Sequence, residues 1–286
     1  MHARTRDLSR RARVHRRRPA ASCEPATGSD RGAPPSHARS RTATFAPVCT
    51  LIFGLGVLGP GTVLIATNRD EDPARTSEPP QVLVREPLVV GGRDVVAGGT
   101  WLALRADLPG VAMLLNRRDP TPEKPGRRSR GLLTLDVASA ADPRERALAE
   151  AAIGHYAPCS LVWLSPAESW HLSIRPGHKP ALEPIAPGWH AITHFEMDDA
   201  ADPRASLVLA RIAKWRPSSR EDAESRLTSI LASHGGGGAP AFCLHEGRAP
   251  TVSAALLWLA PGGISHRHSQ GRPCVTPFED WTHLIR

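Results

Sequence analysis

An α+β sandwich built mainly from antiparallel strands is the fold class that the sequence predicts. Short apolar segments alternate with glycine-rich turns over residues 49–116, and a second series of such segments covers 160–194. Two helical segments then follow one another within 203–234, and the chain returns to strands near its end. Strands, helices and strands again, in separate blocks, argue against the regular strand–helix alternation of a doubly wound sheet.

The first 47 residues differ in composition from the rest of the chain. They contain eleven arginines, no lysine and three acidic residues, and this balance accounts for the net charge of +8 of the whole chain. The remaining residues carry 25 basic and 25 acidic side chains, so we expect no basic face for nucleic acid. Because residues 1–47 cannot bury enough apolar area to offset chain entropy, the sequence predicts a disordered basic leader there.

Residues 45–67 contain no charged side chain and are long enough to span a bilayer as a helix. A membrane anchor is therefore one interpretation of this segment. However, glycine and proline cluster at 54–61, where they would break a helix. The sequence favours a buried hairpin, with strands at 49–55 and 62–67 joined by a turn, and we expect no membrane insertion.

Local signals predict the remaining elements in order. Asp142 and Pro143 suit the N-cap and first position of a helix that ends near Ile153. Ser219 suits the N-cap of another helix, which a run of glycines ends after His234. The sequence also predicts loops at 78–87 and 117–130, a helix at 203–214, and strands at 88–90, 95–97, 100–105, 110–116, 160–164, 170–174, 190–194, 242–245, 252–259 and 264–269.

Cysteines and histidines give no clear ligand pattern. The five cysteines are scattered without a Cys-x-x-Cys pair, which is more typical of reduced thiols than of disulfides or a zinc site. Among thirteen histidines, chance pairs are expected, and a His-x-His pair on a late strand is typical of a solvated face. We therefore predict no metal site and no cofactor, and we expect Cys159 and Cys243 to be core residues. The side chains considered as metal or haem ligands are His194, Cys243, His245, His266 and His268.

A polar quartet, Asn68-Arg69-Asp70-Glu71, follows an apolar segment that has the pattern of a buried strand. Three consecutive charges at the end of such a strand need partners, because an unpaired charge near a core is costly. Taken alone, the quartet is compatible with a salt-bridged loop. A second polar and glycine-rich sequence, Ala97-Gly98-Gly99-Thr100-Trp101-Leu102, comes further along the chain.

Together these two sequences resemble the NRDE family of transport-and-Golgi-organisation-type proteins. Members typically begin with Met-Cys and an apolar strand, and Val48-Cys49 stands at the corresponding position. The leader therefore has three interpretations: a basic tail, a targeting segment, or an over-extended gene start, in which case the true chain begins at residue 48. The resemblance implies a single domain over 48–286 with a four-layer αββα sandwich of the N-terminal-nucleophile hydrolase type. Weaker matches are Leu115-Asn116, Ser129-Arg130-Gly131 and Thr251-Val252-Ser253.

The same resemblance implies four catalytic residues. Cys49 would be the nucleophile, with its own α-amine as the base once it is the first residue. Arg69 would stabilise the thiolate, Asp70 would orient the amine, and Asn116 would donate to an oxyanion. Two features depart from the family pattern. Cys49 is internal, and Val252 stands where the family has arginine, with no later cation obviously placed to replace it.

The function implied is that of a cytoplasmic cysteine amidohydrolase acting on a small amide or N-acyl substrate. The alternative is a non-enzymatic protein that binds or traffics haem or a lipid in the same cleft. Neither the identity of the small molecule nor the oligomeric state follows from the sequence. The residues expected to contact the small molecule are Asn68, Glu71, Gly98, Gly99, Thr100, Trp101, Thr251 and Ser253.

Overall fold

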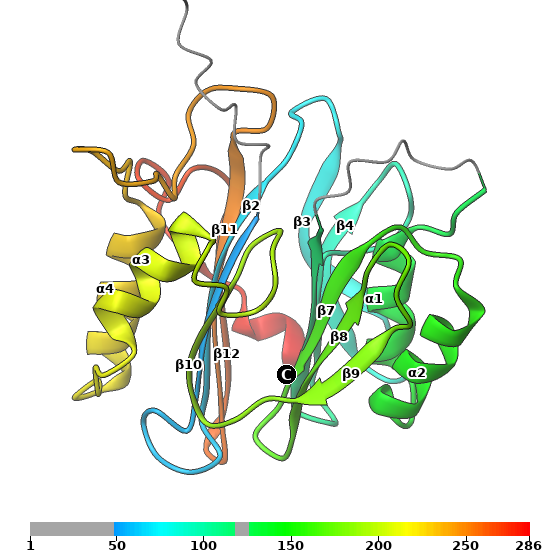
Figure 1. Ribbon diagram of the computed structural model, residues 1–286. Coiled ribbons are helices and arrows are strands. Elements are labelled where there is room, and N and C mark those ends of the chain that lie inside the picture. The colour runs from blue at the N-terminus through cyan, green and yellow to red at the C-terminus, as the bar shows by residue number, and fades with distance from the viewer. Residues whose placement is uncertain (1–48, 118–125) are drawn as a thin grey trace, which may run out of the picture. The chain divides into compact units, whose positions relative to one another are not determined.

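Two sheets face each other, and helices lie on the outer side of each sheet (Figure 1). The structure is a computed structural model that describes residues 49–117 and 126–286, so the predictions for residues 1–47 lie outside the described residues. All the paired strands in the described ranges run antiparallel. The predicted α+β class with two mainly antiparallel sheets is confirmed.

The first sheet has six strands in the order β10-β1-β2-β11-β12-β13, and two helices pack on it. The central strands β1, β2 and β11 come from opposite ends of the described chain. The strands are β1 (Thr50–Leu55), β2 (Val63–Asp70), β10 (Gly188–Ile192), β11 (Thr251–Ala260), β12 (Gly263–Ser269) and β13 (Glu279–Asp280). The helices are α3 (Pro203–Ile212) and α4 (Arg220–Leu231), and a 3-10 helix, η1 (Thr282–Ile285), ends the chain.

The second sheet has seven strands that follow one another in sequence order, from β3 to β9. Two helices inserted between β6 and β7 cover its outer face. The strands are β3 (Ser77–Val84), β4 (Val89–Asp94), β5 (Leu102–Arg105), β6 (Gly110–Asn116), β7 (Cys159–Leu164), β8 (Ser169–Ile174) and β9 (Ala181–Pro184). The helices are α1 (Arg130–Ser139) and α2 (Pro143–Ile153).

Three apolar layers explain why the central strands are continuously hydrophobic. Successive side chains of a strand point to opposite faces, so a strand buried on both faces needs no polar residue. On β1, Leu51 and Phe53 lie in the core between the sheets, whereas Ile52 lies in the core beneath α3 and α4. On β7, Val162 faces the core between the sheets and Trp163 faces α1 and α2. The predicted four-layer αββα sandwich is therefore confirmed.

The predicted hairpin at the start of the described chain is formed by β1 and β2. Its register places Thr50 opposite Asn68, so Cys49 lies beside the end of β2, where the charged quartet begins. No helix in the described ranges is both long and apolar enough to cross a lipid bilayer.

Several local predictions agree with the structure and others are wrong. The side chain of Asp142 caps α2 by accepting from two backbone N–H groups, and Ser219 caps α4. The expected loop at 78–87 is wrong, because β3 occupies much of it. As the edge strand of its sheet, β3 tolerates Pro79 and Pro80 at a shift in register.

Three further elements differ from the predictions. Helix α1 was not predicted, because its first turn has neither an acidic residue nor a side-chain cap. Residues 95–97 form a turn, not a strand. Residues 242–245 are not a strand either, since Phe242 and Cys243 donate their backbone N–H groups to Ser233 at the end of α4.

Candidate active site

A cavity of about 680 Å³ lies at the end of β2, next to Cys49. Its size is within the range of small-molecule sites, roughly 300–1,000 Å³. Half of the twelve residues predicted from the sequence line this cavity: Cys49, Arg69, Glu71, Thr100, Trp101 and Asn116. The segment Ser129-Arg130-Gly131, a weaker match to the family, lines it as well.

Cys49 directly precedes β1 and is half-buried at the cavity. Its thiol donates a weak hydrogen bond to the backbone oxygen of Asp70, 3.7 Å away. Burial and the nearby Asp70 charge raise the pKa of the Cys49 thiol to about 11, although the Arg69 guanidinium acts in the opposite direction. In the intact chain the thiol is therefore protonated at neutral pH.

Arg69 is held rigidly at the cavity wall. Its guanidinium carbon lies 4.2 Å from the centre of the Trp101 ring, in a cation–π contact. It also donates to the Ser77 hydroxyl over 3.1 Å and pairs with Glu71 at 3.5 Å. Only 6% of its side chain is exposed, so Arg69 presents a fixed positive charge near Cys49 without free movement.

Asp70 turns its carboxylate away from the cavity. It accepts a hydrogen bond of 2.6 Å from the Thr251 hydroxyl and pairs with Arg204 at 3.2 Å. Burial raises the pKa of the Asp70 carboxyl to about 6, against the opposing effects of Arg204 and Thr251. Arg204 also donates to the Thr50 hydroxyl, so this cation from α3 ties β2 to β1. Arg204 was not predicted as a partner of the quartet, because 134 residues separate it from Asp70.

Asn68 and Thr251 support the fold and do not line the cavity. The fully buried amide of Asn68 donates to the backbone oxygens of Leu231 and Phe242, each at 2.9 Å. Thr251 bridges Asp70 to the backbone N–H of Leu244. The side chains of these two residues thus bind other parts of the protein, and their contact with a small molecule stays a prediction.

Gly98 and Gly99 serve two different purposes. Gly98 has a φ of +71° in the turn after β4, a conformation that favours glycine. Gly99 lies against the first turn of α1, and a Cβ atom there would be 2.3 Å from the carbonyl carbon of Gly131. Thr100 donates its backbone N–H to Gly131 as well. Two sequences that carried the family resemblance thus meet at the cavity wall.

Arginines outnumber acids among the residues that line the cavity. Five arginines line it against two acids, Glu71 and Asp94. Asp94 is already paired with Arg75 at 2.6 Å, and Arg127 has a buried Nη1 atom without a hydrogen-bond partner among the described residues. Glu71 pairs with Arg69, and Asp136 and Glu150 pair with Arg128, so much of the arginine charge is neutralised within the protein. The unpartnered Nη1 atom of Arg127 favours an anionic group on the bound molecule. The five arginines are Arg69, Arg75, Arg127, Arg128 and Arg130.

The histidine pair on β12 is buried, which contradicts the expectation of a solvated face. His266 and His268 are 1% and 5% exposed, and burial lowers their pKa values to about 3 and about 4. Both line a small void of about 10 Å³, which is room for about one water molecule. Ser253 lines this void, not the large cavity.

These observations define an αββα sandwich protein in which a cysteine directly before strand β1 lines a cavity with several arginines. The chain belongs to the Transport and Golgi organisation 2 family, whose model matches residues 61–233. No curated protein sequence matches the chain. Among solved structures, the chain is similar to a Caenorhabditis elegans N-acylethanolamine-hydrolyzing acid amidase ortholog, with a TM-score of 0.49 and 11% identity over 73% of this chain and 92% of that chain.

Proposed function

We propose that this protein is an N-terminal-nucleophile cysteine amidohydrolase that acts, in the cytoplasm, on a small N-acyl or amide substrate carrying an anionic group. The observation that carries the proposal is the position of Cys49. It stands at the start of a central strand of an αββα sandwich, and it shares a cavity of substrate size with the fixed cation Arg69. Arg127, which has a buried Nη1 atom without a hydrogen-bond partner among the described residues, supplies the preference for an anion.

The chemistry requires that the residue at position 48 is removed from the domain over 48–286, so that Cys49 becomes its first residue. Its α-amine, which titrates near neutrality, then takes the thiol proton, and the sulfur attacks the substrate carbonyl. The C–N bond breaks as the protonated amine returns the proton to the leaving nitrogen. Water then hydrolyses the thioester and releases the acid. Arg69 stabilises the thiolate, Asn116 is available to donate to the oxyanion, and Asp70 acts as a positioning residue through its backbone oxygen.

The raised thiol pKa of the intact chain is consistent with this requirement, because it describes Cys49 without a neighbouring amine. The test is a chain that begins Met-Cys49, with removal of the methionine confirmed by intact mass. Its Cys49 should react with iodoacetamide faster than free cysteine near pH 7, and the chain should hydrolyse members of an N-acyl amide panel. Cys49→Ala should abolish hydrolysis while the chain still folds.

Two arginine variants test the electrostatic part of the proposal. Arg69→Ala should slow alkylation about tenfold, equivalent to about one pKa unit. Arg75→Ala is the matched control, because Arg75 lines the same cavity but is not among the charges that shift the pKa of Cys49. The proposal fails if the processed chain alkylates no faster than free cysteine and hydrolyses no amide in the panel.

A binding protein for haem or a lipid is the second candidate. It is favoured by the protonated thiol together with Arg127, whose unpartnered Nη1 atom suits a carboxylate of haem or of a fatty acid. Under this hypothesis Cys49→Ala leaves the affinity for haem or a fatty acid unchanged, whereas Arg127→Ala lowers it about tenfold. The exposed Arg216→Ala serves as the control. Equal affinity in the Arg127 and Arg216 variants would exclude the cavity as the binding site.

A further inference from the structure

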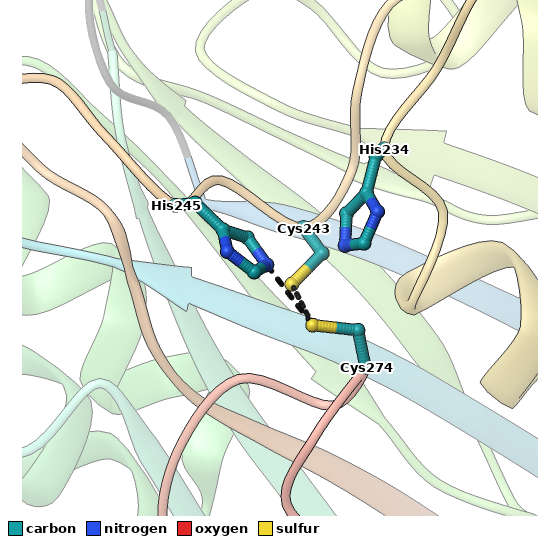
Figure 2. Close-up of side chains that lie close together, drawn as sticks. All are labelled: His234, Cys243, His245 and Cys274. Atoms are coloured by element: carbon teal, nitrogen blue, oxygen red, sulfur yellow. Dashed lines mark hydrogen bonds between the residues drawn. The ribbon is translucent and has the colours of Figure 1, made fainter.

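Four side chains with metal-binding atoms converge beyond the end of α4, outside the cavity of Cys49 (Figure 2). Two are cysteines and two are histidines, and their ligand atoms all lie within 4.8 Å of one another. They come from three separate parts of the chain: the turn after α4, the segment before β11, and the turn after β12. The four residues are His234, Cys243, His245 and Cys274.

We propose that these four residues bind one zinc ion in a closed tetrahedral site. A set of two thiolates and two imidazoles is a common ligand set of structural zinc sites, and soft sulfur donors disfavour calcium or magnesium. The sequence did not predict this site, because the cysteines are 31 residues apart and no Cys-x-x-Cys pair announces them. The inference is independent of the proposed hydrolase activity.

The distances within the cluster are close to those of a tetrahedral site. The Sγ atoms of Cys243 and Cys274 are 3.4 Å apart, and Nε2 of His245 is 3.0 Å from Sγ of Cys274. Zinc bonds of about 2.3 Å to sulfur and about 2.0 Å to nitrogen give tetrahedral edges of roughly 3.3–3.8 Å. Small side-chain rotations therefore suffice to place one ion among the four atoms.

The backbone around the cluster holds the ligands in place. Phe242 and Cys243 donate their N–H groups to Ser233, the residue before His234, so two ligand-bearing segments are joined directly. Asn68 reinforces this junction from β2, since its amide donates to the backbone oxygens at 231 and 242. A set of mutual hydrogen bonds between Leu244 and Thr251 fixes the segment to β11.

Cys274 is presented by a tight turn. Val275 and Thr276 both donate to the backbone oxygen of Arg272, and the Ser269 hydroxyl donates to that of Thr276. Gly271 packs against Thr276, where a Cβ atom would approach the hydroxyl oxygen to 2.5 Å. The turn therefore delivers the sulfur of Cys274 to a defined point opposite Cys243.

Zinc binding at the four side chains balances in protons and in charge. A neutral imidazole has a free electron pair on one ring nitrogen, which can bind the metal without losing a proton. Zinc displaces one proton from each thiol, and the site then holds the dication with two thiolates and two neutral imidazoles. Binding therefore releases two protons and needs no oxidant or reductant.

A disulfide between Cys243 and Cys274 is the chemical alternative. The sulfurs are 3.4 Å apart, well beyond the bond length of about 2.05 Å, and both cysteines are free thiols in the structure. A disulfide would leave His234 and His245 without a role. The zinc site accounts for all four residues, and its effect is to fasten the turn after β12 to the segment that supports Thr251 and Asp70.

The test uses the full chain, reduced, incubated with zinc and freed of unbound metal. Elemental analysis should find about one zinc per chain. Cobalt should give the thiolate charge-transfer and d–d absorption of a tetrahedral site. Cys274→Ser and His245→Gln should each lower zinc affinity by at least about tenfold. The matched controls are Cys49→Ser and the exposed His178→Gln, which should bind zinc like the wild type.

Each outcome bears on the proposal. Loss of zinc affinity in the two cluster variants, with wild-type circular dichroism, supports it. Since Cys243 is buried and its replacement risks misfolding, the half-buried Cys274 and the exposed His245 carry the test. The proposal is overturned if the fully reduced chain retains no zinc, if cluster and control variants bind equally, or if mass spectrometry of the freshly purified chain finds Cys243 joined to Cys274.

Discussion

Arg204 of α3 and Asp70 of β2 form a buried ion pair, with Nη1 of the arginine 3.2 Å from Oδ2 of the aspartate. The carboxylate is completely buried, and 14% of the arginine side chain is exposed. The pair joins the outer helical layer to the strand that ends in the charged quartet. It also explains how the quartet carries an acidic residue beneath the surface, because Arg204 and Thr251 together satisfy both carboxylate oxygens.

Removing the arginine should destabilise the fold strongly. Arg204→Ala leaves a buried carboxylate without its counter-ion, and we expect a loss of about 3–5 kcal/mol in the free energy of unfolding at neutral pH. Urea unfolding measures this loss. Arg211→Ala, an exposed position on the same helix, is the control and should cost less than about 0.5 kcal/mol. Equal losses in the two variants would show that the ion pair has no special role.

Asp70 should make stability depend on pH in an unusual direction. Burial raises its pKa to about 6, so the folded state binds the proton more tightly than the unfolded state. Asp70 therefore contributes its full stabilisation below the pKa that it has in the unfolded chain, and this stabilisation is lost as pH rises through about 6. From about pH 4 to about pH 7, the stability of Asp70→Asn relative to the wild type should improve by about 2–3 kcal/mol. A difference that stays constant, or that moves the other way, contradicts the assignment.

The two asparagines predicted from the sequence should behave differently. Asn68→Ala leaves two buried carbonyl groups without donors and should cost about 2–4 kcal/mol of stability. Asn116→Ala, at an exposed position lining the cavity, should change stability by less than about 0.5 kcal/mol. Thermal and urea unfolding of the two variants give the comparison. A larger loss of stability in Asn116→Ala than in Asn68→Ala would show that Asn116, and not Asn68, supports the fold.

Much of the fold follows from contiguous sequence, and the exceptions share a physical cause. Asp142-Pro143 and Ser219 mark helix starts because caps are local, and the β1–β2 hairpin has its turn within the sequence that it joins. Strand β3 contains two prolines that look like loop residues, and only its position at the sheet edge makes them acceptable. Edge position is a property of the assembled sheet and has no local signal.

The candidate site was predictable only where its residues lie close together in the sequence. Cys49 and Arg69 lie together because two neighbouring strands pair, and this follows from a short hairpin. In contrast, the partner of Asp70 comes from α3, and the four proposed zinc ligands come from three distant segments. Such contacts depend on how the layers pack, and no residue pattern near the quartet specifies them.

Gly99 should be intolerant of a side chain. A Cβ atom there would overlap the backbone of Gly131, which cannot move without displacing the first turn of α1, so Gly99→Ala should cost about 1–3 kcal/mol or more. Gly262→Ala is the matched control, because a Cβ atom there meets no atom within 4 Å. Unfolding curves of both variants decide the matter. Equal stability of Gly99→Ala and Gly262→Ala would show that the backbones of Gly99 and Gly131 are not in close contact.

In the full chain, Cys49 should be a slow nucleophile. With a pKa of about 11, only roughly one thiol in 3,000 is ionised at about pH 7.5, against about a tenth of free cysteine. The thiolate of higher pKa is intrinsically more nucleophilic, which offsets part of this difference. Alkylation of Cys49 by iodoacetamide should therefore be roughly 10–30-fold slower than that of free cysteine. Its rate should rise about tenfold per pH unit up to the thiol pKa.

Peptide mapping by mass spectrometry separates Cys49 from the other cysteines, and Cys49→Ser confirms the assignment of its peptide. Unfolding the chain in urea provides an internal control, because it removes the burial and the Asp70 charge that raise the pKa. The rate in urea should approach that of free cysteine. Fast alkylation of the folded full chain near neutral pH would contradict the raised pKa, and it would mean that Cys49 is activated without becoming the first residue.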